Sequence, residues 1–346
     1  MKKRILCALL VLVMGASLPA GCQRTKTPEP VKGSTFAMDT IMSFTLYSED
    51  EISGQGVLTG LTSLLGSLDS VLSATREDSD IARVNRSGGQ PVEVSSWTGD
   101  LLSQTLALCE LTGGALDITA YPAIKAWGFT TGEHRVPSSG ELAELAADID
   151  YAAVQVEKNT VALPAGMELD LGAAAKGYAG DLLARNIRDN GISSALLDLG
   201  QSTIAAVGRK PDGSPWRVGV QDPNGDGYFA VIELADMAMG TSGGYQRYFE
   251  QDGVAYWHIL NPKTAAPARS GLISVTVVSP SALVCDGLST ALFVMGLEEG
   301  ARFWREHSEL DFEAVFMTED GSIYRTAGLT GSFFPTEGYE EVTVLE

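Results

Sequence analysis

Two oxygen-bearing side chains stand one helical turn apart in an apolar stretch of this 346-residue chain. Asp286 and Thr290 lie within residues 281–291, where most other residues are small or apolar. Residues four apart share one face of a helix, and a buried carboxylate needs a partner. Two oxygens that converge on one point suit a hard cation such as Mg²⁺. Alternatively, Thr290 bonds back to its own helix and Asp286 acts as a cap or in an ion pair.

A second segment, residues 170–178, has the composition of an anion-binding helix start. Asp170 ends a predicted strand, small residues follow, and Lys176 falls in the first turns of a predicted helix. Free N–H groups and the helix dipole favour an anion there, and a lysine adds a point charge for a phosphate. The alternative is an alanine-rich helix packed tightly on a sheet, with Lys176 in solvent.

A third segment combines small and hydroxyl residues with one of the chain's three histidines. Residues 240–244 read Gly-Thr-Ser-Gly-Gly and precede a predicted hairpin whose far arm carries His258. Hydroxyls such as that of Ser242 can donate to a ligand. His258 is a candidate base, although a lone histidine on a strand is more often structural than catalytic.

Hydrophobic periodicity predicts the elements that position these residues. Helices are expected over 53–73, 99–111, 141–149, 172–190 and 281–295, with a polar loop over 75–79. Strands are expected over 42–47, 194–199, 216–220, 228–234 and 272–278, with hairpins at 245–260 and 312–326. Antiparallel hairpins interleaved with a few long helices indicate an α+β fold. We expect one compact catalytic domain over residues 34–346.

The charge balance excludes one class of partner. The chain has 24 basic and 44 acidic residues, a formal net charge of −20. Nucleic acid binding needs clustered Lys and Arg, so nucleic acid is not expected as a partner. An anionic ligand could bind only through a local positive feature, namely a bound metal, a helix N-terminus or a lysine that points into the site. The histidine and cysteine spacings predict no zinc site.

The first residues have the pattern of an export signal. Lys2, Lys3 and Arg4 precede a short apolar run, and small residues then lead to Cys22. We expect residues 1–21 to be a lipoprotein signal peptide, Cys22 the lipidated N-terminus, and residues 22–33 a flexible tether. The protein would then be extracytoplasmic and anchored to the cell membrane. The alternative is a plain cleaved signal with an incidental cysteine.

Two further cysteines lie in apolar helical stretches. Cys109 and Cys285 are expected to be buried thiols. A disulfide between them remains the alternative in an oxidising compartment.

Taken together, these segments resemble the ApbE family of FAD:protein FMN transferases. The resemblance extends from about Ser34 to Gly296. The stretches that carry it are AMDT (37–40), GALDIT (114–119), WGF (127–129), DLGAAAKGY (170–178), LGQ (199–201), WRVGVQDP (216–223), TSG (241–243), HILNP (258–262) and DGLST (286–290).

The resemblance implies an ApbE-like (T-fold-like) α+β fold and a site for FAD and Mg²⁺. The carbonyl of Ala173, the carboxylate of Asp286 and the hydroxyl of Thr290 would hold the metal. His258 and Asp286 would be the catalytic residues, with His258 as base. The FAD-binding positions would be Met38, Thr75, Ala115, Leu116, Asp117, Asp170, Lys176, Ser242 and Ile259.

Four positions depart from the family pattern. Asp39 and Gln201 stand where glycines are usual, and Asn261 replaces an aspartate. Thr75 stands where many members carry a tyrosine that covers the flavin. Without that aromatic lid, we expect weaker FAD binding and easier access for water.

The implied activity is Mg²⁺-dependent cleavage of the FAD pyrophosphate. FMN would pass to a Thr or Ser hydroxyl of an acceptor flavoprotein, and AMP would leave. Two other functions stay open: an FAD pyrophosphatase with water as acceptor, and a non-catalytic flavin-binding lipoprotein. The Asp286–Thr290 pair argues against the last, because storage needs no metal site.

Overall fold

One large sheet runs through the part of the chain that the computed structural model describes, residues 29–346. Within that part, all neighbouring strands pair antiparallel except the last two, which are parallel. The strand order is β1 (Val31–Ala37), β2 (Thr40–Leu46), β6 (Ala195–Asp198), β7 (Thr203–Val207), β10 (Ala238–Gly243), β15 (Leu272–Ser279), β16 (Glu313–Thr318), β17 (Ile323–Thr326) and β19 (Val342–Leu345).

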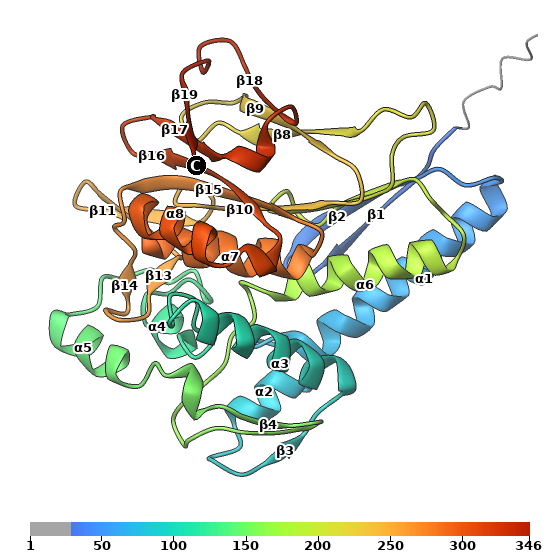
Figure 1. Ribbon diagram of the computed structural model, residues 1–346. Helices are drawn as coiled ribbons and strands as arrows, with labels where there is room; N and C mark the ends of the chain where they lie inside the picture. Colours follow the sequence, from blue (N-terminus) through green and yellow to red (C-terminus); the bar gives the residue numbers. More distant parts are fainter. Residues whose placement is uncertain (1–28) are drawn as a thin grey trace, which may run out of the picture.

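Both faces of the middle of this sheet are covered (Figure 1). Helices α1 (Glu51–Leu72), α6 (Ala175–Asp189) and α7 (Ala282–Met295) pack on one face. A small sheet of β18 (Phe333–Pro335), β9 (Tyr228–Leu234) and β8 (Trp216–Gln221) packs on the other. In β7, Ala205 and Val207 join the helix-side core, while Ile204 and Ala206 join the core under the small sheet. A strand buried on both faces is mostly apolar, as β7 is apart from Thr203.

The long helices have clear start signals. Asp50 caps α1 by accepting from the Ser53 N–H, and Ser281 caps α7 by accepting from the Val284 N–H. Helix α7 ends at Gly296, whose φ of 84° is in the left-handed region. These signals fix where the helices begin and end, and therefore which of their residues face the sheet.

The remaining elements lie around the large sheet and the helices that cover it. The helices are α2 (Asp80–Asn85), α3 (Ser96–Leu111), α4 (Tyr121–Ala126), α5 (Ser139–Ala147) and α8 (Leu297–Glu306), with short 3₁₀ turns at Tyr151–Ala153, Ser308–Leu310 and Ala327–Leu329. The strands are β3 (Val92–Glu93), β4 (Gln155–Glu157), β5 (Thr160–Ala162), β11 (Tyr248–Gln251), β12 (Val254–Trp257), β13 (Leu260–Asn261) and β14 (Ala266–Pro267).

The predicted α+β class, with antiparallel sheets and packed long helices in one compact domain, is confirmed. Three boundaries differ from the prediction. Strand β1 takes the last three residues of the predicted tether, and α6 begins at Ala175 rather than residue 172. Residues 240–243, which were placed before the predicted hairpin and assigned to no element, belong to the central strand β10. The short helices α2, α4 and α8 were not predicted.

Cys109 and Cys285 are free thiols, both buried, so the disulfide alternative is wrong. Burial raises the pKa of Cys109 to about 12 and that of Cys285 well above its usual value. Cys22 and the predicted signal peptide lie outside the described residues. Across residues 29–346, no helix combines the length and apolarity that crossing a bilayer requires.

Candidate active site

A single cavity of about 920 Å³ collects the predicted site residues. It opens beside the starts of α6 and α7 and is also bordered by the β1–β2 turn and the β11–β12 hairpin. Every predicted site residue within the described range lines it: Met38, Thr75, Ala115, Leu116, Asp117, Asp170, Ala173, Lys176, Ser242, His258, Ile259, Asp286 and Thr290. Segments far apart in sequence thus meet at one place.

Asp286 joins α6 to α7 at the bottom of this cavity. Its Oδ2 accepts from the Gly177 N–H at 2.9 Å, and its Oδ1 accepts from the Thr203 hydroxyl at 3.0 Å. The residue is only 6% exposed. Each carboxylate oxygen has two lone pairs, so both keep acceptor capacity for a cation. Because Gly177 lies in the first turn of α6, the carboxylate caps that helix, which is one of the predicted alternatives, and it forms no ion pair within the described chain.

The Ala173 carbonyl lies just before α6 and is free within the described chain. Helix α6 begins at Ala175 with Ala174 as its N-cap, so the Gly177 N–H belongs to the first turn and has no acceptor within the helix. Here it donates to Asp286, and the Ala173 carbonyl accepts no hydrogen bond from any residue of the described chain. Because Ala173 also lines the cavity, its oxygen is available to a ligand there.

Thr290 completes a group of hydroxyls one turn along α7. Its Oγ1 lies 3.2 Å from the Ser242 Oγ and 3.4 Å from the Asp286 carbonyl oxygen. Ser242 is buried in β10 and also pairs with the Ser289 Oγ at 2.9 Å. Ser242, predicted to bind FAD, is thus bonded to Thr290 and helps to fix its hydroxyl.

These donors fit Mg²⁺ by their chemistry. A carboxylate, an unbonded carbonyl and a hydroxyl are all hard oxygen ligands, and Mg²⁺ commonly keeps waters and substrate phosphates as its other ligands. No group of three or more His, Cys, Asp or Glu side chains converges anywhere in residues 29–346. The arrangement therefore suits a cation shared with an anionic substrate rather than a closed structural metal.

His258 lies across the cavity, just after β12. Its Nδ1 is 3.2 Å from the Arg247 carbonyl oxygen, and its backbone N–H donates to the same oxygen at 3.1 Å. A carbonyl only accepts, so Nδ1 carries the proton and Nε2 is left with a lone pair. Burial, with the charges of Arg247 and Lys176, lowers the pKa of His258 to about 4. The ring is neutral at pH 7 and can accept a proton.

Two cations border the same space. Lys176 and Arg247 line the cavity, and neither forms an ion pair with another side chain of the described chain. Burial raises the pKa of Asp170 beside them, opposed by the Gly172 N–H bond and by both positive charges. Together they give an acidic protein a local field that attracts an anion.

The opposite wall is mostly apolar and is held by Asp117. Leu116 and Ile259 are buried, and Ala115 and Met38 are partly so. The Asp117 carboxylate accepts from the Thr119 N–H and hydroxyl and from the Tyr151 N–H. Such a wall suits a flat ring system.

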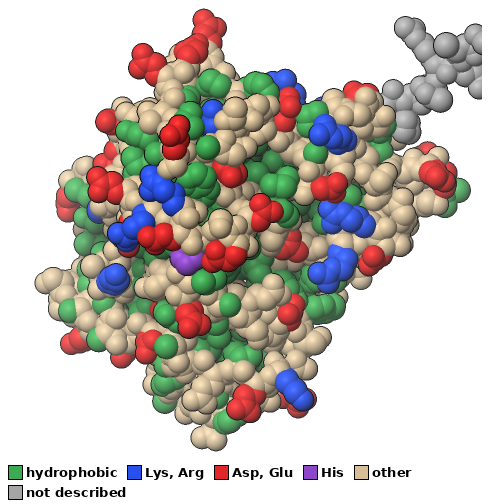
Figure 2. Space-filling model, in the orientation of Figure 1, with side chains coloured by type: hydrophobic (Ala, Val, Ile, Leu, Met, Phe, Trp, Pro, Cys, Tyr) green, Lys and Arg blue, Asp and Glu red, His purple; other side chains and the backbone are tan. Residues whose placement is uncertain are grey.

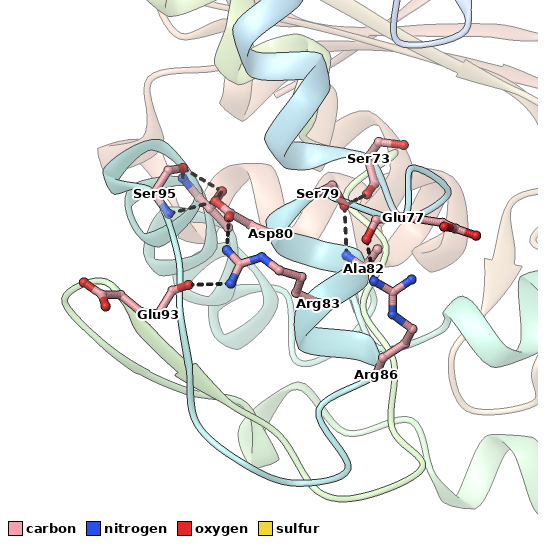
Figure 3. A network of polar contacts seen from close by, with 10 residues as sticks. Ser73, Glu77, Ser79, Asp80, Ala82, Arg83, Arg86, Glu93 and Ser95 are labelled. Atoms are coloured by element: carbon pink, nitrogen blue, oxygen red, sulfur yellow. Dashed lines mark hydrogen bonds and ion pairs between the residues drawn. The ribbon is translucent and has the colours of Figure 1, made fainter.

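The loop that carries Thr75 is held from behind by a polar network (Figure 3). The Ser79 hydroxyl donates to the Ser73 carbonyl, and Arg86 donates to the Glu77 carbonyl. Nearby, Asp80 accepts from the Ser95 N–H, the Thr98 hydroxyl and Arg83. Thr75 itself is exposed at the mouth of the cavity, so its side chain does not close the cavity.

Comparison with known proteins shows the family to which this chain belongs. The family model described as "ApbE family" matches residues 38–316 of this chain. The chain belongs to the ApbE family. Among curated ApbE relatives, the FAD:protein FMN transferase of Vibrio cholerae is 33% identical over 321 residues, covering 90% of this chain and 94% of the relative. That of Treponema pallidum is 35% identical over 285 residues, covering 77% and 78%.

Solved ApbE structures agree. The ApbE protein of Thermotoga maritima superposes with a TM-score of 0.82 at 31% identity, covering 89% of this chain and all of that one. The apo form of the Pseudomonas stutzeri flavinyl transferase ApbE gives 0.77 at 29% identity, covering 90% and 95%.

The backbone explains three departures from the ApbE pattern. Asp39 and Gln201 have φ of 59° and 65°, in the left-handed region where glycine is favoured and where Asp is better tolerated than most residues. The Asp198 carboxylate accepts from the Gln201 N–H at 2.7 Å, which supports that turn. The Asn261 Oδ1 accepts from the Lys263 N–H, as an aspartate would. Asp39, Gln201 and Thr75 line the cavity, whereas Asn261 does not.

Sequence reasoning missed two polar residues of this ApbE site. Thr203 is a lone hydroxyl in an apolar strand, and that pattern is a usable signal for a buried hydrogen bond. Arg247 follows the Gly243-Gly244 turn, and nothing in its local sequence separates it from a surface arginine.

Proposed function

We propose that this ApbE-family chain is a Mg²⁺-dependent FAD:protein FMN transferase. That it is a flavin transferase follows from its family and its relatives. The acceptor hydroxyl forms a bond to the FMN phosphorus, the phosphoanhydride bond breaks, and AMP leaves; the hydroxyl proton passes to a base. The observation that supports the metal is the unbonded Ala173 carbonyl, which lines the same cavity as Asp286 and Thr290.

Residues in different parts of the cavity have different proposed roles. His258 Nε2 accepts the proton of a Thr or Ser hydroxyl, because Nδ1 is already committed to the Arg247 carbonyl. Lys176 and Arg247 lower the repulsion between the nucleophile and the negative diphosphate. Ala173, Asp286 and Thr290 would hold Mg²⁺, which supplies charge neutralisation on the phosphoryl oxygens when bound.

The second candidate is an FAD pyrophosphatase that uses the same residues with water as acceptor. The exposed position of Thr75 favours it, because no aromatic ring from that loop closes the cavity. A non-catalytic flavin-binding role is disfavoured by the three oxygen donors, which storage does not need.

The test uses the mature protein, FAD and Mg²⁺. The probe is the apo-flavoprotein that the Vibrio cholerae relative flavinylates, with that relative as positive control. A transferase increases the acceptor mass by FMN less one water and releases equimolar AMP only when acceptor is present. Equal AMP release without acceptor identifies a hydrolase. FAD that stays bound without AMP, with Mg²⁺ or Mn²⁺, identifies a binding protein.

We also propose that the enzyme works outside the cytoplasm, anchored to the membrane through a lipid on Cys22. The basic and apolar residues before Cys22 support this. Nucleic acid is not among the proposed partners: in Figure 2 acidic and basic side chains are interspersed over the visible face without a broad basic area.

A further inference from the structure

The hairpin β1–β2 has one covered face and one open face. On the covered side, Leu58 of α1 packs against Gly33. On the open side, alternate residues of both strands are exposed: Lys32, Ser34, Phe36, Ile41 and Ser43. We call these five residues the hairpin patch. Strand β1 is also the edge of the large sheet, so within the described chain no further strand of that sheet lies beyond it.

Two large apolar side chains stand together in this patch. Phe36 and Ile41 are directly paired across the two strands, and they are 70% and 69% exposed. Paired side chains normally shield each other, so this exposure shows that no residue between 29 and 346 covers the pair. Contiguous exposed apolar side chains of this size indicate a surface that another molecule covers.

The patch is continuous with the active site. Phe36 lines the catalytic cavity, as do Met38, Asp39 and Thr40 of the adjoining turn, whereas Ile41 does not. Any macromolecule that brings a hydroxyl to His258 must pass the mouth of this cavity. The patch also contains no carboxylate in a chain of net charge −20, so it does not repel an acidic partner as the rest of the surface does.

We propose that the hairpin patch is the docking surface for the acceptor flavoprotein. The occupant is the acceptor segment on one side of its flavinylated Thr or Ser, carrying an apolar side chain that covers Phe36 and Ile41. This inference rests on the proposed transferase function. The proposed docking surface predicts that Ile41 contributes to the affinity for the acceptor. Ile41 should not affect the reaction of FAD, because it lies outside the cavity.

The test compares Ile41→Ser with Ile52→Ser in the mature protein, using the same apo-flavoprotein probe. Ile52 is a matched control, 85% exposed at the start of α1 and outside the cavity. Ile41→Ser is expected to raise the KM for acceptor about tenfold. Its kcat at saturating acceptor and its KM for FAD stay at the wild-type values. Ile52→Ser is expected to change none of these.

An unchanged acceptor KM in Ile41→Ser, or an equal rise in Ile52→Ser, overturns the proposal. Sedimentation of the wild type and Ile41→Ser tests a second copy as occupant, and loss of a wild-type dimer in the variant would also overturn it. Reduced binding to phosphatidylglycerol vesicles with unchanged acceptor KM would assign the patch to lipid instead. If the wild type releases AMP but never modifies the acceptor, the transferase function itself fails, and with it the docking surface.

Discussion

The carboxylate of Asp286 is oriented before any substrate arrives. The Gly177 N–H and the Thr203 hydroxyl hold its two oxygens from different elements. The same side chain satisfies buried donors and supplies the only carboxylate of the proposed metal site. Its effect on stability and its effect on activity can therefore be separated by comparing two substitutions.

Asp286→Asn is expected to abolish turnover without loss of stability. An asparagine can still accept from Gly177 and can donate to a reoriented Thr203 hydroxyl, but it has no charge for Mg²⁺. We expect Mg²⁺-dependent AMP release to fall by on the order of 10²–10³-fold, with a thermal midpoint near that of the wild type.

The matched variant Asp286→Ala should lose both activity and stability. It leaves two buried donors unpaired, at about 1–3 kcal/mol each. Calorimetry and an AMP assay on both variants check the pair. Full Mg²⁺-dependent turnover in Asp286→Asn would remove Asp286 from the metal site.

Arg247→Gln is expected to shift the pH dependence of the reaction. The positive charge of Arg247 helps to lower the pKa of His258 to about 4, so removing it raises that pKa. A base must be unprotonated, and a higher pKa keeps His258 protonated to a higher pH. The acidic limb of kcat/KM should therefore move to higher pH.

Arg209→Gln serves as control, because Arg209 bonds only the Gly213 carbonyl and lies outside the cavity. Its acidic limb should coincide with that of the wild type. If the limb of Arg247→Gln also stays in place, His258 is not the titrating base.

At the residue scale, the sequence predicted the side-chain oxygen ligands of the proposed metal site but not how they are oriented. The four-residue spacing placed Asp286 and Thr290 on one face of α7. It gave no sign that Gly177 would donate to Asp286, because that bond joins residues 109 positions apart. Backbone atoms such as the Ala173 carbonyl leave no residue-type signal, and only the family resemblance named it.

At the scale of elements, the cavity depends on the close approach of α6 to α7. A Cβ on Gly177 would lie 2.3 Å from the Ala282 carbonyl oxygen, and one on Gly240 would lie 2.7 Å from the Cys285 backbone. Gly240 therefore reflects the closeness of α7 to β10, and nothing in the local sequence of residues 240–243 indicates this packing.

Gly177→Ala is expected to destabilise the protein by about 1–3 kcal/mol and to reduce activity, because the helices must separate around Asp286. Gly66→Ala is the control, since Gly66 lies inside α1 with nothing within 4 Å of its Cβ position. That change should stabilise by up to about 1 kcal/mol. Urea unfolding measures both; equal stabilities would contradict the tight packing.

The long helices were predictable because leucines recur over several turns, as in α1. The short helices α2 and α4 span six residues each, too few to show a period. Strand β1 was missed because its residues are polar or only partly buried. Pairing with β2, and not its own composition, makes it a strand.

At the scale of the whole molecule, the acidic surface and the two cations Lys176 and Arg247 of the cavity act together. Lys176 and Arg247 concentrate positive potential where the diphosphate must bind, while the net charge of −20 leaves other anions unattracted. The thiols of Cys109 and Cys285 are buried and of raised pKa, so the proposed export to an oxidising compartment would not threaten them.

Cys22→Ser is expected to abolish lipidation of the exported protein. Mass spectrometry of the N-terminal peptide should find an acylated Cys22 as first residue in the wild type, and an unacylated chain in the variant. Cys7→Ser is the control, because residue 7 lies within the predicted signal peptide. A wild-type N-terminus without acyl groups would identify an ordinary cleaved signal.

The position of β1 sets how far from the bilayer this enzyme can work. Fully stretched, the eight residues from Gln23 to Pro30 reach at most about 30 Å. Strand β1 adds roughly 20 Å more before Phe36 at the cavity mouth. A lipid on Cys22 would therefore keep Phe36 within about 50 Å of the lipid headgroups. Proteins whose flavin sites lie farther than that from the membrane would be out of reach.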